Sequence, residues 1–104
     1  MEESNVSEEL DDIIRIFSER LATAGGINNK VKFSLDEGST ILMDSTGVRL
    51  AENSVAADVI LHTRVKTLTG IFDGSINPAL AFIAGKIRVE GDTGIAKSLK
   101  GILL

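Results

Sequence analysis

The sequence has no cysteine, tryptophan or tyrosine, and its 104 residues include one histidine, one proline and four phenylalanines. Without cysteine the fold has neither disulfide bonds nor a thiolate metal site, and a cysteine nucleophile is excluded. With His62 as the one histidine, a zinc site is excluded as well. Because aromatic residues are so scarce, aliphatic side chains must fill almost all of the interior.

Targeting signals and long apolar runs are also missing. The acidic start, residues 1–4, lacks the basic and apolar regions of a signal peptide. No apolar stretch approaches the roughly 18 to 20 residues that span a bilayer. The last residues, 101–104, do not match the Ser-Lys-Leu type of peroxisomal signal. We therefore expect a cytoplasmic protein.

The net charge of −4 is unevenly distributed. Residues 1–52 carry five Lys or Arg against eleven Asp or Glu, whereas residues 53–104 carry six against four. The acidic half argues against a nucleic-acid partner, which requires a dense basic surface. The mildly basic half permits contact with an anionic head group.

Hydrophobic periodicity in the first part of the chain predicts one helix followed by strands. Apolar residues at helical spacing predict a helix over residues 7–24, which ends at a pair of glycines. Alternating patterns then predict short strands over 31–35, 41–44, 48–50 and 58–62. Because turn residues separate these strands, we expect an antiparallel meander.

The second part of the chain returns to helical spacing. Thr63 is predicted to cap a helix that stops at residues 73–74, and Asn77 with the following Pro78 is a typical start for a short helix. Residues 86–90 alternate as a fifth strand, and one last amphipathic helix follows the cap residue Asp92. This order of elements predicts an α+β fold, formed by residues 1–104 as a single domain.

The sequence offers no catalytic centre. A Ser-His-acid triad would need His62, and no Gly-x-Ser-x-Gly elbow presents a nucleophile. His62 in a strand is most simply a rim residue or a core histidine with its hydrogen bonds satisfied. Residues 91–94 lack the lysine of a phosphate loop, so we interpret them as a turn and a helix cap. We expect no catalytic residues, no metal and no cofactor.

Residues 57–104 carry a specific combination of motifs. It consists of an Ala-Asp-Val strand at 57–59, a Gly-x-x-Asn-Pro helix start at 74–78 and a Gly-Lys-x-x-x-x-Gly-Asp strand at 85–92. In this the chain resembles the sterol carrier protein type 2 family. The resemblance implies a five-stranded, mostly antiparallel sheet covered by helices, with an apolar tunnel between them. It also implies non-catalytic carriage of a sterol, fatty acid, fatty acyl-CoA or phospholipid, here by a free-standing bacterial member.

The apolar stripes of the later helices are the candidates for the tunnel lining. We predict lipid contact for Leu68, Ile71, Phe72, Leu80, Ile83, Leu99, Ile102 and Leu103. Lys97 and Lys100, away from the apolar side of the last helix, suit transient contact with an anionic membrane or a CoA phosphate. An empty apolar cavity is costly, so we expect bound lipid to stabilise the protein strongly.

The sequence is also compatible with two other functions. The chain could present a prenyl or acyl lipid to a separate biosynthetic enzyme, or it could be a structural or dimerising module with a solid core. We expect a monomer or a weak dimer, with no nucleic acid bound.

Overall fold

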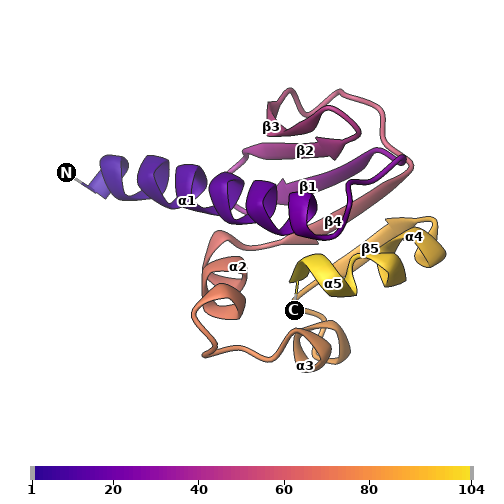
Figure 1. The fold of residues 1–104 in the computed structure, drawn as a ribbon. Helices are drawn as coiled ribbons and strands as arrows, with labels where there is room; N and C mark the ends of the chain where they lie inside the picture. The colour runs from indigo at the N-terminus through magenta and orange to yellow at the C-terminus, as the bar shows by residue number, and fades with distance from the viewer. Residues whose placement is uncertain (1, 104) are drawn as a thin grey trace.

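The computed structural model describes residues 2–103, with side chains for residues 8–99 and 101–103. Figure 1 shows the long helix α1 (Glu2–Thr23) lying across one face of a sheet, with the shorter helices gathered beside it. The buried side of α1 carries Leu10, Ile13, Phe17 and Leu21, as the helical spacing predicts. No helix among the described residues is long and apolar enough to cross a membrane.

The sheet has five strands in the order β3-β2-β1-β4-β5. Their bounds are β1 (Val31–Leu35), β2 (Thr40–Asp44), β3 (Gly47–Ala51), β4 (Val59–Thr63) and β5 (Arg88–Gly91). All neighbouring strands pair antiparallel except β1 and β4, which pair parallel. The α+β fold class with a mostly antiparallel five-stranded sheet is therefore confirmed.

The prediction of a four-stranded meander is wrong for the fourth strand. After β3 the chain crosses to the far side of β1, where Val59 lies opposite Val31 in the parallel register. Lys32 holds this crossing segment by donating from Nζ to the carbonyls of Asn53 and Val55, each at 2.8 Å. The sequence predicts a turn between β3 and β4, but the connecting residues 52–58 are numerous enough to carry the chain across the sheet.

The remaining helices are α2 (Val65–Phe72), α3 (Pro78–Ile83), α4 (Thr93–Ser98) and α5 (Lys100–Leu103). The single last helix predicted from the sequence is thus two helices, divided at Leu99. The Leu99 side chain is fully buried, and its amide bonds the Ala96 carbonyl at 3.1 Å, which tightens the turn. The break lets α5 turn its apolar residues back toward the core.

Thr63 does not cap α2 as predicted, because it belongs to β4. Its hydroxyl donates to the Lys86 carbonyl at 3.0 Å instead. The Val65 amide at the start of α2 donates to the Asp36 carboxylate at 3.0 Å, in the turn between β1 and β2. A residue distant in the sequence thus supplies the cap, and local pattern cannot reveal such a partner.

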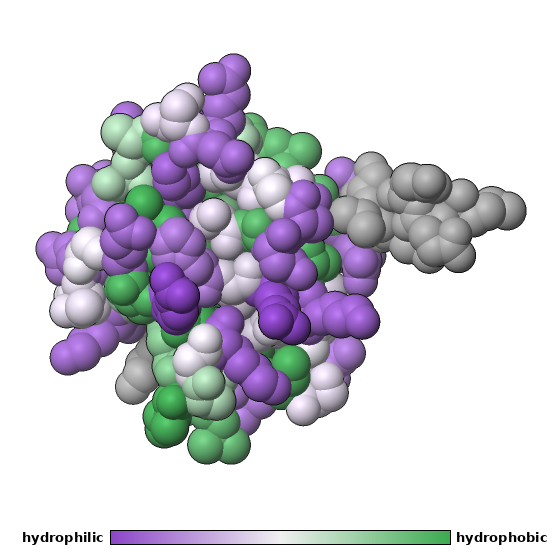
Figure 2. Space-filling view, turned by 180° about the vertical axis from the view of Figure 1, so that it is seen from behind, coloured by the Kyte–Doolittle hydropathy of each residue, from purple (hydrophilic) through white to green (hydrophobic). Residues whose placement is uncertain are grey.

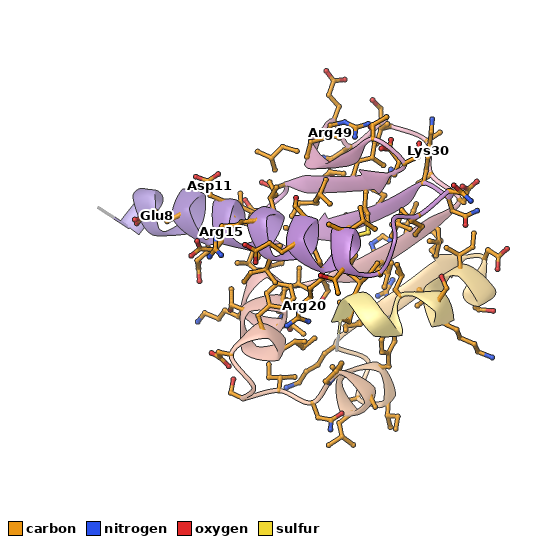
Figure 3. All side chains as sticks on the ribbon, in the orientation of Figure 1. Glu8, Asp11, Arg15, Arg20, Lys30 and Arg49 are labelled. Atoms are coloured by element: carbon orange, nitrogen blue, oxygen red, sulfur yellow. The ribbon has the colours of Figure 1, made fainter. Side chains whose placement is uncertain are left out.

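Three of the four phenylalanines form the centre of the core. Phe17 stacks on Phe33 with ring centroids 4.7 Å apart and meets Phe72 edge-on at 5.2 Å. Arg20 lies over the Phe72 ring at 5.0 Å and donates to the Ile102 carbonyl at 3.0 Å. Figure 3 shows Arg20 pointing from α1 toward the shorter helices, so this side chain ties α1 to α5.

Asp44, at the end of β2, is held by several donors. Arg49 contacts both carboxylate oxygens at 2.8 and 3.0 Å, and the Thr46 amide and hydroxyl donate at 2.9 and 2.6 Å. Hydrogen bonds from Arg49 and then from Thr46 hold the pKa of Asp44 well below its usual range. Ionised Asp44 therefore stabilises the fold at neutral pH, and this contribution declines as the pH falls below about 4, the unfolded value.

Replacing Asp44 by asparagine is expected to lower the free energy of unfolding by about 1–2 kcal/mol at pH 7, because charge-assisted hydrogen bonds are lost. The difference between Asp44→Asn and wild type should shrink at pH 3, where only the unfolded wild-type carboxylate takes up a proton. Urea unfolding at the two pH values measures both differences. An equal difference at pH 7 and pH 3 would contradict the role assigned to the ionised group.

Candidate functional site

An apolar cavity of 240 Å³ lies between α3, β5, α4 and α5. Two of its lining residues, Thr93 and Lys97, are polar, and the other side chains are aliphatic or aromatic. The lining consists of Pro78, Ala79, Phe82, Val89, Thr93, Ala96, Lys97 and Leu103. Ala79, Thr93 and Lys97 are exposed, so the cavity opens to solvent on their side.

The helix α3 forms one wall, and the sequence fixes where it begins. The Asn77 side chain accepts hydrogen bonds from the amides of Ala79 and Leu80 at 2.9 and 3.2 Å. Pro78 occupies the first turn, where its missing N–H costs nothing. The predicted cap at Asn77 is confirmed, and it places Ala79 and Phe82 on the cavity side.

The opposite wall is built from β5 and α4. Asp92 caps α4 by accepting from the amides of Gly94 and Ile95 at 2.8 and 3.3 Å, as predicted. Gly91 just before it has φ of 106°, and a Cβ there would lie 2.8 Å from the Asp58 carbonyl oxygen. Only glycine allows β5 to approach β4 this closely and then turn into α4.

Among the side chains that the structure describes, Lys97 is the one ionisable group in the lining of this cavity. His62 is on the sheet face away from α1, where its Nε2 lies 2.8 Å from the Glu90 carboxylate. Within the described part of the chain, no group of three or more His, Asp or Glu could hold a metal ion. The described lining is thus suited to surround apolar material, and it places the cationic side chain of Lys97 at the opening.

The residues predicted to contact lipid divide into three groups. Leu103 lines the cavity. The second group belongs to the hydrophobic core or packs against it, and it consists of Leu68, Ile71, Phe72, Leu99 and Ile102. Leu80 and Ile83 are 62% and 82% exposed on α3. Lipid contact by these residues, and a continuous tunnel, stay predictions.

Most of the cavity lining was not identified from the sequence. The helix α3 is apolar on all sides, so its periodicity does not show which side chains face inward. The small residues Ala79 and Ala96 make room for the cavity, whereas the predictions favoured large side chains. Ala79 and Phe82 share one side of α3, but Leu80 and Ile83 have the same spacing, so no local signal separates the lining pair from the exposed pair.

Comparison with known proteins decides the family. The model of the SCP-2 sterol transfer family matches residues 10–104. The chain belongs to this family. Among curated relatives, hydroxysteroid dehydrogenase-like protein 2 of Xenopus laevis is 37% identical over 60 residues, which cover 58% of this chain but 14% of the frog protein. The chain thus matches a small part of a longer relative.

Solved structures show the same fold as this SCP-2 family chain. Sterol carrier protein 2 of Aedes aegypti, in complex with palmitate, has a TM-score of 0.74 at 17% identity and covers 91% of this chain and 94% of its own. Sterol carrier protein 2 like 2 of the same mosquito has a TM-score of 0.73 at 17% identity and covers 90% and 95%. At such identities the agreement concerns the fold.

Proposed function

We propose that this SCP-2 family chain binds the apolar part of a lipid in the 240 Å³ cavity and carries it without catalysis. The observation that most supports this proposal is the apolar composition of the cavity wall, in which only Thr93 and Lys97 are polar among the described lining residues. The family membership and the Aedes aegypti structure in complex with palmitate support the proposal.

The size of the cavity favours a single apolar chain over a bulkier ligand. Sites that bury a drug-sized ligand enclose about 300–1,000 Å³, which is more than the 240 Å³ here. Each buried methylene contributes about 0.8 kcal/mol, so even part of an acyl chain gains appreciable affinity. In α3 only Ala81 is buried, and this helix can therefore move outward to admit a longer chain.

Lys97 suits the head group of such a ligand. Its side chain is exposed at the opening, where an ammonium group can meet a carboxylate or phosphate while the tail stays inside. Presentation of a prenyl or acyl lipid to a separate enzyme would use the same cavity. A test of cavity binding is therefore also the first test of that alternative.

Palmitate at saturating concentration is expected to raise the melting temperature, since a ligand bound to the folded state alone stabilises it. At 100 times the dissociation constant the gain is about 2.7 kcal/mol, or about 10–20 °C for a domain of this size. The variant Ala79→Phe places a ring in the cavity and should lose most of this rise. Differential scanning calorimetry measures both.

Ala22→Phe is the matched control, because Ala22 is an exposed helical alanine on α1, away from the cavity. It should keep the full rise with palmitate. No rise for the wild type, or an equal rise for Ala79→Phe and Ala22→Phe, would contradict the proposal.

A further inference from the structure

The helix α3 exposes two large aliphatic side chains next to the cavity. Leu80 and Ile83 are 62% and 82% exposed, and Leu50 on β3 is the third exposed large hydrophobic residue in the described part of the chain. Ala79 and Phe82, on another side of α3, line the cavity. One side of α3 therefore faces the cavity proposed to hold lipid, and another side, with Leu80 and Ile83, is exposed to solvent.

A basic hollow adjoins α3 at both of its ends. Ile76 before the helix and Gly85 after it line this hollow of 520 Å³. Its basic members come from the start of α2 and from the segment leading into β5, and they are Arg64, Lys66, Lys86 and Arg88. All four are exposed, and none forms a salt bridge or a side-chain hydrogen bond within the described residues.

The surroundings of the basic hollow contain few opposing charges. Between residues 62 and 88, Asp73 is the one acidic residue against four basic ones. Glu90 is paired with His62, and Asp36 accepts from the Val65 amide. Figure 3 shows acidic Glu8 and Asp11 on α1, on the side of the molecule away from α3. The positive charge is thus concentrated beside the exposed apolar residues.

Figure 2 shows the molecule from behind, on the face away from α1. Hydrophilic side chains cover most of this face, and a green apolar group lies at its lower edge, where Figure 1 places α3. An apolar edge flanked by Lys and Arg is the pattern of proteins that lie on anionic membranes.

We infer that α3 and the basic hollow together form a docking surface for an anionic lipid bilayer. Leu80 and Ile83 enter the head-group region, and the four basic side chains meet lipid phosphates. The inference rests on the proposed function, because docking in this orientation brings α3, one wall of the cavity, against the bilayer. It places the membrane contact on α3, whereas the sequence suggested the last helix.

Charge and composition favour a bilayer over a protein partner. Two copies meeting through this surface would bring like charges together. A protein interface of useful affinity centres on buried aromatic anchors, whereas the exposed large side chains here are two aliphatic residues on one short helix. Two aliphatic side chains and several cations suit weak, reversible membrane contact instead.

Sedimentation with vesicles of phosphatidylcholine containing phosphatidylglycerol tests the inference. The wild type should bind these vesicles and bind less at high salt or without phosphatidylglycerol. The double variant Lys86→Gln with Arg88→Gln should lower the partition coefficient about 30-fold, from about 1 kcal/mol for each charge. Ile83→Ser should lower it about tenfold.

Leu50→Ser and the pair Arg15→Gln with Lys30→Gln are the matched controls. They remove an equally apolar exposed side chain and an equal charge from regions away from α3, and they should leave vesicle binding unchanged. Controls that bind as weakly as the α3 variants would overturn the inference. The inference would also be overturned if vesicle binding by the wild type did not depend on phosphatidylglycerol. A dimer in analytical ultracentrifugation that Ile83→Ser abolishes would overturn it as well.

Palmitate binding in solution is measured on every variant, which separates the two proposals. Vesicle binding with the expected variant pattern but without palmitate binding would reject the cavity and support the docking surface. Palmitate binding without charge-dependent vesicle binding would overturn the docking surface and leave the proposed function intact.

Discussion

Replacing Phe17 by alanine is expected to lower the free energy of unfolding by about 3–5 kcal/mol, the usual cost of truncating a fully buried aromatic residue. Phe17 is fully buried and contacts both Phe33 and Phe72, at ring centroid distances of 4.7 and 5.2 Å. Its loss leaves a space between α1 and the sheet that neighbouring aliphatic side chains cannot fill. Because domains are stable by about 5–15 kcal/mol in total, the variant should be close to unfolding.

Chemical denaturation of the Phe17→Ala variant measures this loss. Ile16→Ala is the control, since Ile16 is on the same helix and only partly buried, outside the core cluster. The control should cost much less than Phe17→Ala. Equal losses for the two variants would show that the aromatic cluster does not carry the stability assigned to it.

The second large effect is expected at Gly91, for which alanine should cost about 2–4 kcal/mol from backbone strain and a steric clash. Its φ of 106° is unfavourable for any residue with a Cβ. The added Cβ would also lie 2.8 Å from the Asp58 carbonyl oxygen and 3.2 Å from the Val59 Cα. Both contacts are with backbone, so β4 and β5 must separate to make room.

Gly85→Ala distinguishes the two sources of this cost. Gly85 also has a positive φ, 78°, but nothing lies within 4 Å of a Cβ at that position. It should therefore lose only the strain contribution, about 1–2 kcal/mol. Thermal unfolding of both variants gives the comparison. If Gly85→Ala cost as much as Gly91→Ala, the close approach of β5 to β4 would not matter for stability.

Local sequence signals predicted the parts of the fold that depend on near neighbours. The helical stripe of α1 and the caps at Asn77 and Asp92 are all as expected, because each involves residues a few positions apart. The errors concern distant partners. The parallel pairing of β4 with β1 and the cap that Asp36 supplies to α2 join residues 28 or 29 positions apart.

The site was less predictable than the fold for a related reason. A cavity exists where side chains are small, and hydrophobic periodicity identifies large ones. Ala79 and Ala96 line the cavity, whereas Leu68 and Leu99 fill the core. Because every residue of α3 is apolar, its sequence also does not indicate which side of the helix is exposed. Leu80 and Ile83 follow the sequence pattern for burial, and yet they lie on the surface.

The most direct test of lipid binding in the cavity is an NMR measurement of contacts between bound palmitate and the protein. With palmitate carrying protons and the protein isotopically labelled, nuclear Overhauser contacts report which side chains touch the acyl chain. Contacts from the chain methylenes to Phe82, Val89 and Ala96 are the predicted result. Contacts confined to other surfaces, or none at saturating palmitate, would contradict the account.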